Sequence, residues 1–128
     1  MPFVILSAER ASLSPSANAR RTAALVEDLM GDALGLNVQP VLSYYKGHIE
    51  KSFMVHVDDD EDYDVLRWLA VQWNQESILI VDDAFAATLV FLADGSTQDI
   101  GTWTLASYGV PPADDGWTQH GHMYFACR

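Results

Sequence analysis

The sequence predicts a single α+β domain over residues 1–128, with two helices packed on one face of a mostly antiparallel sheet. Three observations predict this fold. Two stretches are amphipathic at helical spacing, several short apolar runs have the length of strands, and their coarse order is β-α-β-β-α-β-β-β-β. A hydrophobic fraction of 49% is enough for one core, and a charged fraction of 20% is too low for a disordered acidic chain.

The chain begins with a predicted strand and a predicted helix. Residues 3–6 form a short run of β-forming side chains, which is typical of a buried strand. Ser14 and Pro15 predict a helix start, because serine caps free N–H groups and proline lacks the N–H that a first turn leaves unbonded. Apolar positions at helical spacing carry this helix to about Ala33, and Gly35 predicts its end.

A hairpin and a second helix follow. Residues 37–45 are compatible with a strand, which Pro40 would place at an edge or a bulge, because proline cannot donate to a ladder. After a turn at 46–48, residues 52–57 alternate between apolar and polar, the period of a half-buried strand. Residues 60–73 then place their large apolar side chains on one helical face.

The last third of the chain completes the predicted sheet. Residues 77–81 are almost uniformly apolar, as in a central strand covered on both faces. Residues 87–92 form the next strand, before a turn at Asp94 and Gly95. Two further strands are predicted at 100–105 and 123–127, and the glycines and prolines between them predict a loop.

The formal net charge of −11 argues against direct binding to nucleic acid or to an anionic membrane, because a polyanion repels phosphate. It favours a basic partner. No apolar run approaches the ~20 residues of a membrane span, and the first residues lack the basic start of a signal peptide. A single cysteine, Cys127, suits a reducing compartment. We therefore expect a cytoplasmic protein, in the host cytoplasm if a phage encodes it.

The densest charge lies between the predicted hairpin and the second helix. Six of seven consecutive residues are acidic: Asp58, Asp59, Asp60, Glu61, Asp62 and Asp64. A calcium loop of the EF-hand type needs glycine at its sixth position and glutamate at its twelfth, where this chain has Tyr63 and Leu69. Two interpretations stay open. The run is a solvated helix start capped by Asp59 or Asp60, or it is a recognition surface for a basic partner.

Motifs for metal binding and catalysis are weak. His120 and His122 alternate, but no cysteine pair or HExxH motif accompanies them, so we predict no metal site. No Gly-x-Ser-x-Gly elbow and no glycine-rich phosphate loop occurs, and we expect no cofactor. These observations lean against an enzyme.

A set of polar residues is not explained by amphipathicity: Asn18, Arg21, Tyr45, Glu50, Ser52, Gln75 and Glu76. Asn18 and Arg21 form an Asn-x-x-Arg pair on one helix face, and residues 47–53 read Gly-x-x-Glu-x-Ser-Phe. With the run at 74–79, these motifs resemble a family of small α+β proteins from bacteria and their phages that has no established activity. The resemblance covers residues 3–81 and implies the fold and a bacterial or phage setting.

Two interpretations of this polar cluster stay open. An ion pair between Arg21 and either Glu50 or Glu76 would join the first helix to the sheet. Alternatively, Asn18, Arg21, Glu50 and Gln75 form the pocket of a small enzyme or a small-ligand-binding protein. The preferred hypothesis is a non-enzymatic acidic binding protein, a phage effector or anti-defence inhibitor that occupies a basic surface of a host or defence protein. The oligomeric state is left open.

Overall fold

The structure, a computed structural model, describes residues 2–10, 12–31, 37–45 and 47–128. Its described strands form a closed barrel in the order β1-β3-β2-β7-β8-β6-β5-β4, and each neighbouring pair is antiparallel. The elements are β1 (Phe3–Leu6), α1 (Pro15–Gly31), β2 (Val38–Tyr45), β3 (His48–His56), α2 (Asp60–Gln72), β4 (Ser77–Val81), β5 (Ala86–Phe91), β6 (Thr97–Tyr108), β7 (Gly116–His120) and β8 (Met123–Cys127).

The predicted α+β fold, with two helices on one face of a sheet, is wrong because the sheet closes on itself. The strand that closes it is β7, which pairs with β2 on one side and with β8 on the other. The sequence analysis assigned no strand to these residues, since Gly116, Thr118 and Gln119 give them neither an apolar run nor a clear alternation. Without β7 the remaining strands form an open sheet.

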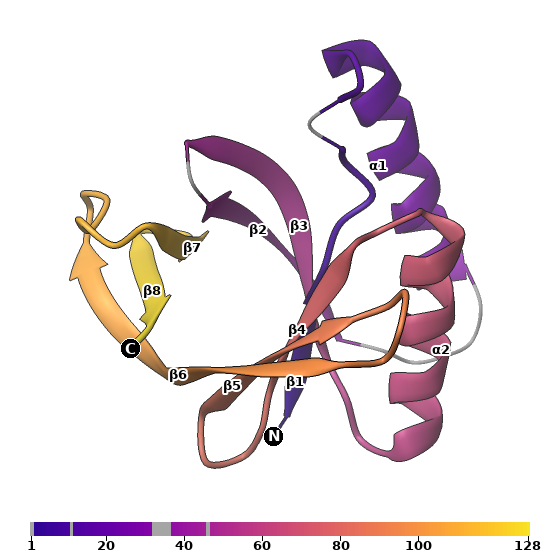
Figure 1. Ribbon diagram of the computed structural model, residues 1–128. Helices are drawn as coiled ribbons and strands as arrows, with labels where there is room; N and C mark the ends of the chain where they lie inside the picture. Colours follow the sequence, from indigo (N-terminus) through magenta and orange to yellow (C-terminus); the bar gives the residue numbers. More distant parts are fainter. Residues whose placement is uncertain (1, 11, 32–36, 46) are drawn as a thin grey trace.

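Alternation along the strands separates two apolar clusters. One cluster lies between the strands and the helices, where Val4 and Leu6 of β1 pack with Leu25 of α1 and Leu66 of α2. Both helices lie on the same side of the barrel (Figure 1). The other cluster gathers side chains of opposite parity from six strands: Phe3, Ile5, Val41, Met54, Val81, Ala87 and Trp103. This second cluster fills the interior of the barrel.

Local signals at the helix starts are confirmed. The backbone N–H of Ala17 donates to Ser14 Oγ at 3.2 Å, and the N–H of Asp62 donates to Asp59 Oδ1 at 3.0 Å. Each bond satisfies one of the donors that a first turn leaves free. The predicted stop of the first helix at Gly35 lies outside the described residues. Neither of the described helices is long and apolar enough to cross a membrane.

Candidate functional site

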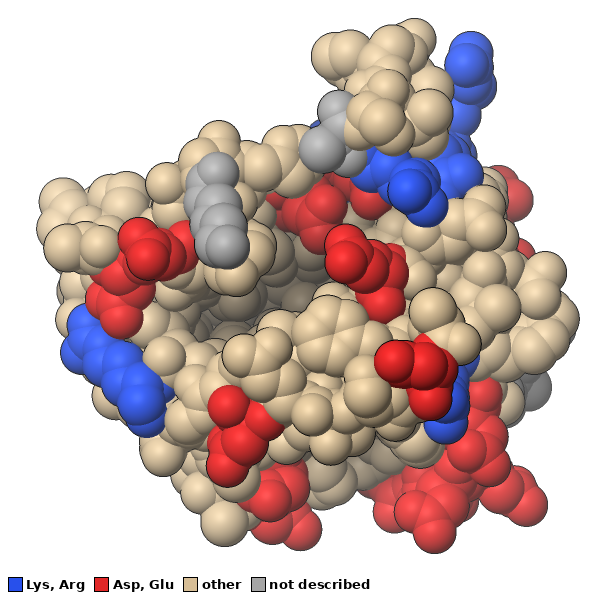
Figure 2. All heavy atoms as spheres, viewed as in Figure 1, with Lys and Arg blue, Asp and Glu red and all other residues tan. Residues whose placement is uncertain are grey.

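One end of the barrel opens as a hollow in the face shown in Figure 2, with carboxylates on its rim. The strand register identifies side chains on the inner face. Glu50 of β3 pairs with Ser43 of β2, and Ser43 pairs with Thr118 of β7. Directly paired residues share one face, and Glu50 has the parity of Met54, which lies in the interior cluster. A row of three polar side chains therefore crosses the inner face, and we call this row and its neighbour His48 the barrel mouth.

The two hydroxyl residues of the barrel mouth are shielded from solvent. Thr118 is buried, and Ser43 Oγ is a buried atom without a hydrogen-bond partner among the described residues. Leaving a buried hydroxyl without a partner costs about 1–3 kcal/mol. A polar group of a bound molecule would recover this free energy.

Glu50 is the carboxylate whose environment differs most from water in this region. Burial raises the pKa of Glu50; His48 opposes the rise, and the negative charge of Glu9 adds to it. The His48 Nε2 and Glu50 Oε2 atoms lie 3.8 Å apart, and the Glu50 side chain is 29% exposed. A partly desolvated carboxylate can bind a cation or accept a proton, and such perturbed groups concentrate at functional sites.

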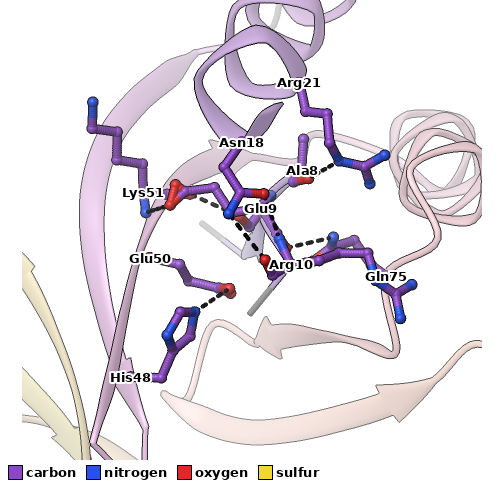
Figure 3. A network of polar contacts seen from close by, with 10 residues as sticks. Ala8, Glu9, Arg10, Asn18, Arg21, His48, Glu50, Lys51 and Gln75 are labelled. Carbon is purple, nitrogen blue, oxygen red and sulfur yellow. Dashed lines mark hydrogen bonds and ion pairs between the residues drawn. The ribbon is translucent and has the colours of Figure 1, made fainter. Parts of the chain in front are cut away.

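Two residues of the predicted polar cluster, Asn18 and Gln75, hold the loop that follows β1 (Figure 3). The side chain of Asn18 exchanges two hydrogen bonds of 2.9 Å with the backbone of Arg10. Gln75 Nε2 donates to the carbonyl of Glu9 at 3.2 Å. These bonds fix the main chain of the loop.

Arg21 bonds to main-chain carbonyls, whereas one of the two interpretations of the cluster paired it with Glu50 or Glu76. Its Nε donates to the carbonyl of Ala8 at 2.6 Å, and its terminal nitrogen donates to the carbonyl of Trp73. The guanidinium also lies over the ring of Trp73, with Cζ at 5.1 Å from the ring centroid. Arg21 thus joins α1, the loop after β1 and the end of α2.

The remaining cluster residues lie at different depths. Ser52 is buried on the inner strand face, opposite Val41. Tyr45 is exposed opposite His48, and Glu76 is exposed just before β4. Ser43, Thr118 and Glu9 were not among the predicted site residues. The hairpin register could have placed Ser43 opposite Glu50, but no local signal marks Thr118.

The acidic run lies at the other end of β3 from Glu50. Asp59 caps α2, and Asp62 Oδ2 accepts the N–H of Asp58 at 3.2 Å. Asp60, Glu61 and Asp62 occupy the first helical turn, where the helix dipole favours negative charge. Helix-start chemistry therefore accounts for part of the run. No contact in the structure tests the basic partner, which stays a prediction.

The His-Gly-His segment forms the turn between β7 and β8. His120 ends β7, and His122 is exposed in the turn. Gly121 has φ +63, a left-handed conformation that glycine adopts without a steric cost. Across the described ranges, no group of three His, Cys, Asp or Glu side chains is placed to hold a metal ion. Burial raises the pKa of Cys127, which disfavours its reactive thiolate.

A protein-family comparison gives a match that covers nearly the whole chain. The model of the S-Adenosylmethionine lyase family matches residues 4–128, which include Glu9, Ser43, Glu50 and Thr118. A search of curated proteins found no match. The family is named for an enzyme, so the match contradicts the predicted non-enzymatic binding protein, its role as a phage effector or anti-defence inhibitor, and the expectation that the chain is not an enzyme.

Proposed function

The chain belongs to the S-adenosylmethionine lyase family, and from this premise we propose that it is an enzyme that cleaves S-adenosylmethionine at the barrel mouth. A lyase breaks a bond without adding water. The reactive centre of S-adenosylmethionine is a sulfonium, a sulfur with three carbon substituents and a positive charge. When one C–S bond breaks, sulfur keeps the bonding electrons and leaves as a neutral thioether, so its departure needs no acid. Because no water is added, the carbon that loses sulfur takes a replacement electron pair from within the substrate, either from its carboxylate oxygen or from a neighbouring C–H bond whose proton is removed.

The environment of Glu50 carries this proposal. Burial raises the pKa of its carboxyl, which means that its negative charge is incompletely compensated in the free protein. In the described part of the chain, the ion pair of Glu50 is with His48 rather than with a lysine or arginine. A sulfonium or ammonium beside Glu50 would supply the missing positive charge, and the net charge of −11 steers cations toward the protein.

The surroundings of Glu50 suit loss of charge at sulfur. Below the barrel mouth, Ile5 and Met54 belong to the apolar interior cluster. An apolar environment disfavours the sulfonium relative to the neutral thioether, so it promotes a step in which that charge disappears. Ser43 Oγ offers a hydrogen bond to a polar group of the substrate without first breaking one within the described residues. Glu50 and Ser43 would therefore orient the substrate next to the apolar interior cluster.

Incubation with S-adenosylmethionine in ¹⁸O-labelled water tests the proposal. We expect consumption of the substrate and release of an adenosine-bearing thioether, with no ¹⁸O in the products; their masses identify the C–S bond that breaks. Glu50→Gln should lower kcat/KM by about a thousandfold, the scale of a lost electrostatic group at a reaction centre.

Glu76→Gln is the matched control, because it removes one exposed carboxylate just before β4, the strand that pairs with β1 on the side opposite β3. It should leave kcat/KM within about threefold of the parent value, as expected for a solvated charge. Absence of turnover by the parent protein, labelled oxygen in the first-formed products, or equal activity of the two variants would contradict the proposal.

A further inference from the structure

We propose that Glu9 is a positioning residue: Glu9 holds Glu50 in place through the backbone of Lys51. The kinetic part of this inference rests on the proposed function, whereas the contact that carries it does not. The carboxylate of Glu9 accepts the backbone N–H of Lys51 at 3.1 Å, and Lys51 is the residue next to Glu50. Glu9 thereby fixes β3 at the barrel mouth.

Side chains continue the pairing of β1 and β3 beyond the point where the strand ladder ends. The register of this pair stops at Leu6 opposite Phe53. Past it, Ser7 Oγ donates to the carbonyl of Lys51 at 2.7 Å, and Glu9 Oε1 accepts the N–H of Lys51. Both backbone groups of Lys51 are thus bonded to side chains from the loop after β1. Without these bonds, the edge of β3 that faces β1 would be unpaired next to Glu50, and β3 would be held there by its pairing with β2 alone.

Glu9 is itself held from several directions (Figure 3). Its N–H donates to Ser7 Oγ at 3.0 Å, and its carbonyl accepts Gln75 Nε2 at 3.2 Å. The neighbouring residues of the loop, Ala8 and Arg10, are bonded to Arg21 and Asn18 of α1. The polar residues singled out in the sequence thus fix the main chain on either side of Glu9, so its carboxylate has a defined place from which to hold Lys51.

The charge of Glu9 acts on the same site. Glu9 is close enough to Glu50 for its negative charge to add to the rise in the pKa of Glu50 that burial causes. Two neighbouring carboxylates favour a ligand with positive charge. S-adenosylmethionine carries a sulfonium and an ammonium, whereas S-adenosylhomocysteine is neutral at sulfur. Glu9 should therefore raise the preference of the site for the sulfonium compound.

Two substitutions distinguish the effect of the Glu9–Lys51 hydrogen bond from the effect of the negative charge of Glu9. Glu9→Ala removes both the acceptor and the charge, and we expect kcat to fall about a hundredfold, as for a misplaced reacting group. Glu9→Gln keeps an acceptor for the Lys51 N–H, so kcat should stay within about threefold. It should nevertheless lower the pKa of Glu50, measured by NMR of the carboxyl carbon. It should also reduce the preference for S-adenosylmethionine over S-adenosylhomocysteine about tenfold.

Hydrogen exchange at the Lys51 amide gives a readout that needs no activity. The amide should be protected in the parent protein and in Glu9→Gln, and should exchange faster in Glu9→Ala. Glu27→Ala, which removes an exposed carboxylate of α1, is the control and should change neither exchange nor kcat. If the parent protein has no lyase activity, the proposed function fails, while exchange and the pKa of Glu50 still test the contact.

Equal losses of kcat in Glu9→Ala and Glu9→Gln would overturn the inference, because they would assign the effect to charge alone. An unchanged Lys51 exchange rate in Glu9→Ala would also overturn it. If Glu9→Ala does not fold, Glu9→Gln decides: a protected Lys51 amide with a lowered pKa of Glu50 supports the inference, and any other result contradicts it.

Discussion

The two ends of β3 carry carboxylates in opposite situations. At the C-terminal end, Asp58 to Asp60 and Glu61 are exposed. The carboxylates of Asp59 and Asp62 accept hydrogen bonds from backbone N–H groups at the start of α2. At the N-terminal end, β3 itself carries one carboxylate, Glu50, which is mostly shielded from water and whose pKa is raised by burial. The run is richer in charge, but the lone residue is the one whose charge is poorly compensated.

This difference shows that environment, rather than the number of charges, marks a carboxylate for function. An exposed acid already has water as its partner, so a cationic ligand gains little by approaching it. A desolvated acid has lost water and gains more from a cation. Under the proposed function, the reactive end of β3 is the one that carries Glu50. Helix-start chemistry accounts for part of the acidic run, and the basic partner stays a prediction.

The largest effect that would sharpen the comparison is the pH dependence of activity. Cation binding requires ionised Glu50, so kcat/KM should fall as the pH drops through a pKa above the usual glutamate value. This acid limb should be absent from the residual activity of Glu50→Gln. An acid limb that is identical in both proteins would assign it to another group.

The same pKa shift fixes the sign of a stability effect. Because the folded-state pKa of Glu50 is raised, its contribution to stability is fully present below the unfolded-state pKa and is lost as the pH rises through the folded-state value. Glu50→Gln should therefore melt at a higher temperature than the parent near neutral pH. The advantage should disappear in acid below the unfolded-state pKa.

A smaller effect is expected from Ser43→Ala. Loss of one substrate hydrogen bond should lower kcat/KM about tenfold. The melting temperature should not fall, because the buried Oγ of Ser43 has no partner among the described residues. Ser96→Ala, in the exposed turn before β6, is the control for activity. A loss of stability without a loss of activity would remove Ser43 from the site.

The smallest effect is expected from the acidic run. The triple substitution Asp60→Asn, Glu61→Gln and Asp64→Asn removes three exposed charges and spares the Asp59 cap. We expect kcat/KM to change less than about threefold, and less still at high salt, because only long-range steering is affected. Steady-state kinetics at two ionic strengths measure this. A loss of more than about tenfold at high salt would break the comparison and bring the run into the site.

The parts of the structure that depend on neighbouring residues could be predicted from the sequence. The Ser14 and Asp59 caps are examples, because each side chain bonds to an N–H three residues further on. Closure of the barrel could not be predicted, because it depends on β2 pairing with β7, which is distant in sequence and has no marked alternation. The predicted fold class therefore failed although many of the elements were expected.

In the candidate site too, features that depend on neighbouring residues could be predicted, and features that depend on distant contacts could not. Glu50 stood out within a hairpin motif, but its burial and its neighbour Glu9 depend on the fold. Thr118 joins the row only through the β2–β7 pairing. Asn18, Arg21 and Gln75, which the sequence analysis grouped with Glu50, all bond to the loop after β1. Their role in holding this loop could not be predicted from the sequence, because their partners are backbone groups that no sequence pattern indicates.

The β2–β7 seam has a consequence for the order of folding. β1, β2, β3 and α2 can associate soon after synthesis, but the seam must wait for residues near position 120. Contacts between such distant segments are slow to form, because a long loop loses entropy before the pairing compensates for it. Thr118 reaches Ser43 and Glu50 only in that step. A nascent chain would therefore complete the barrel mouth only after most of the core around the preceding strands has formed.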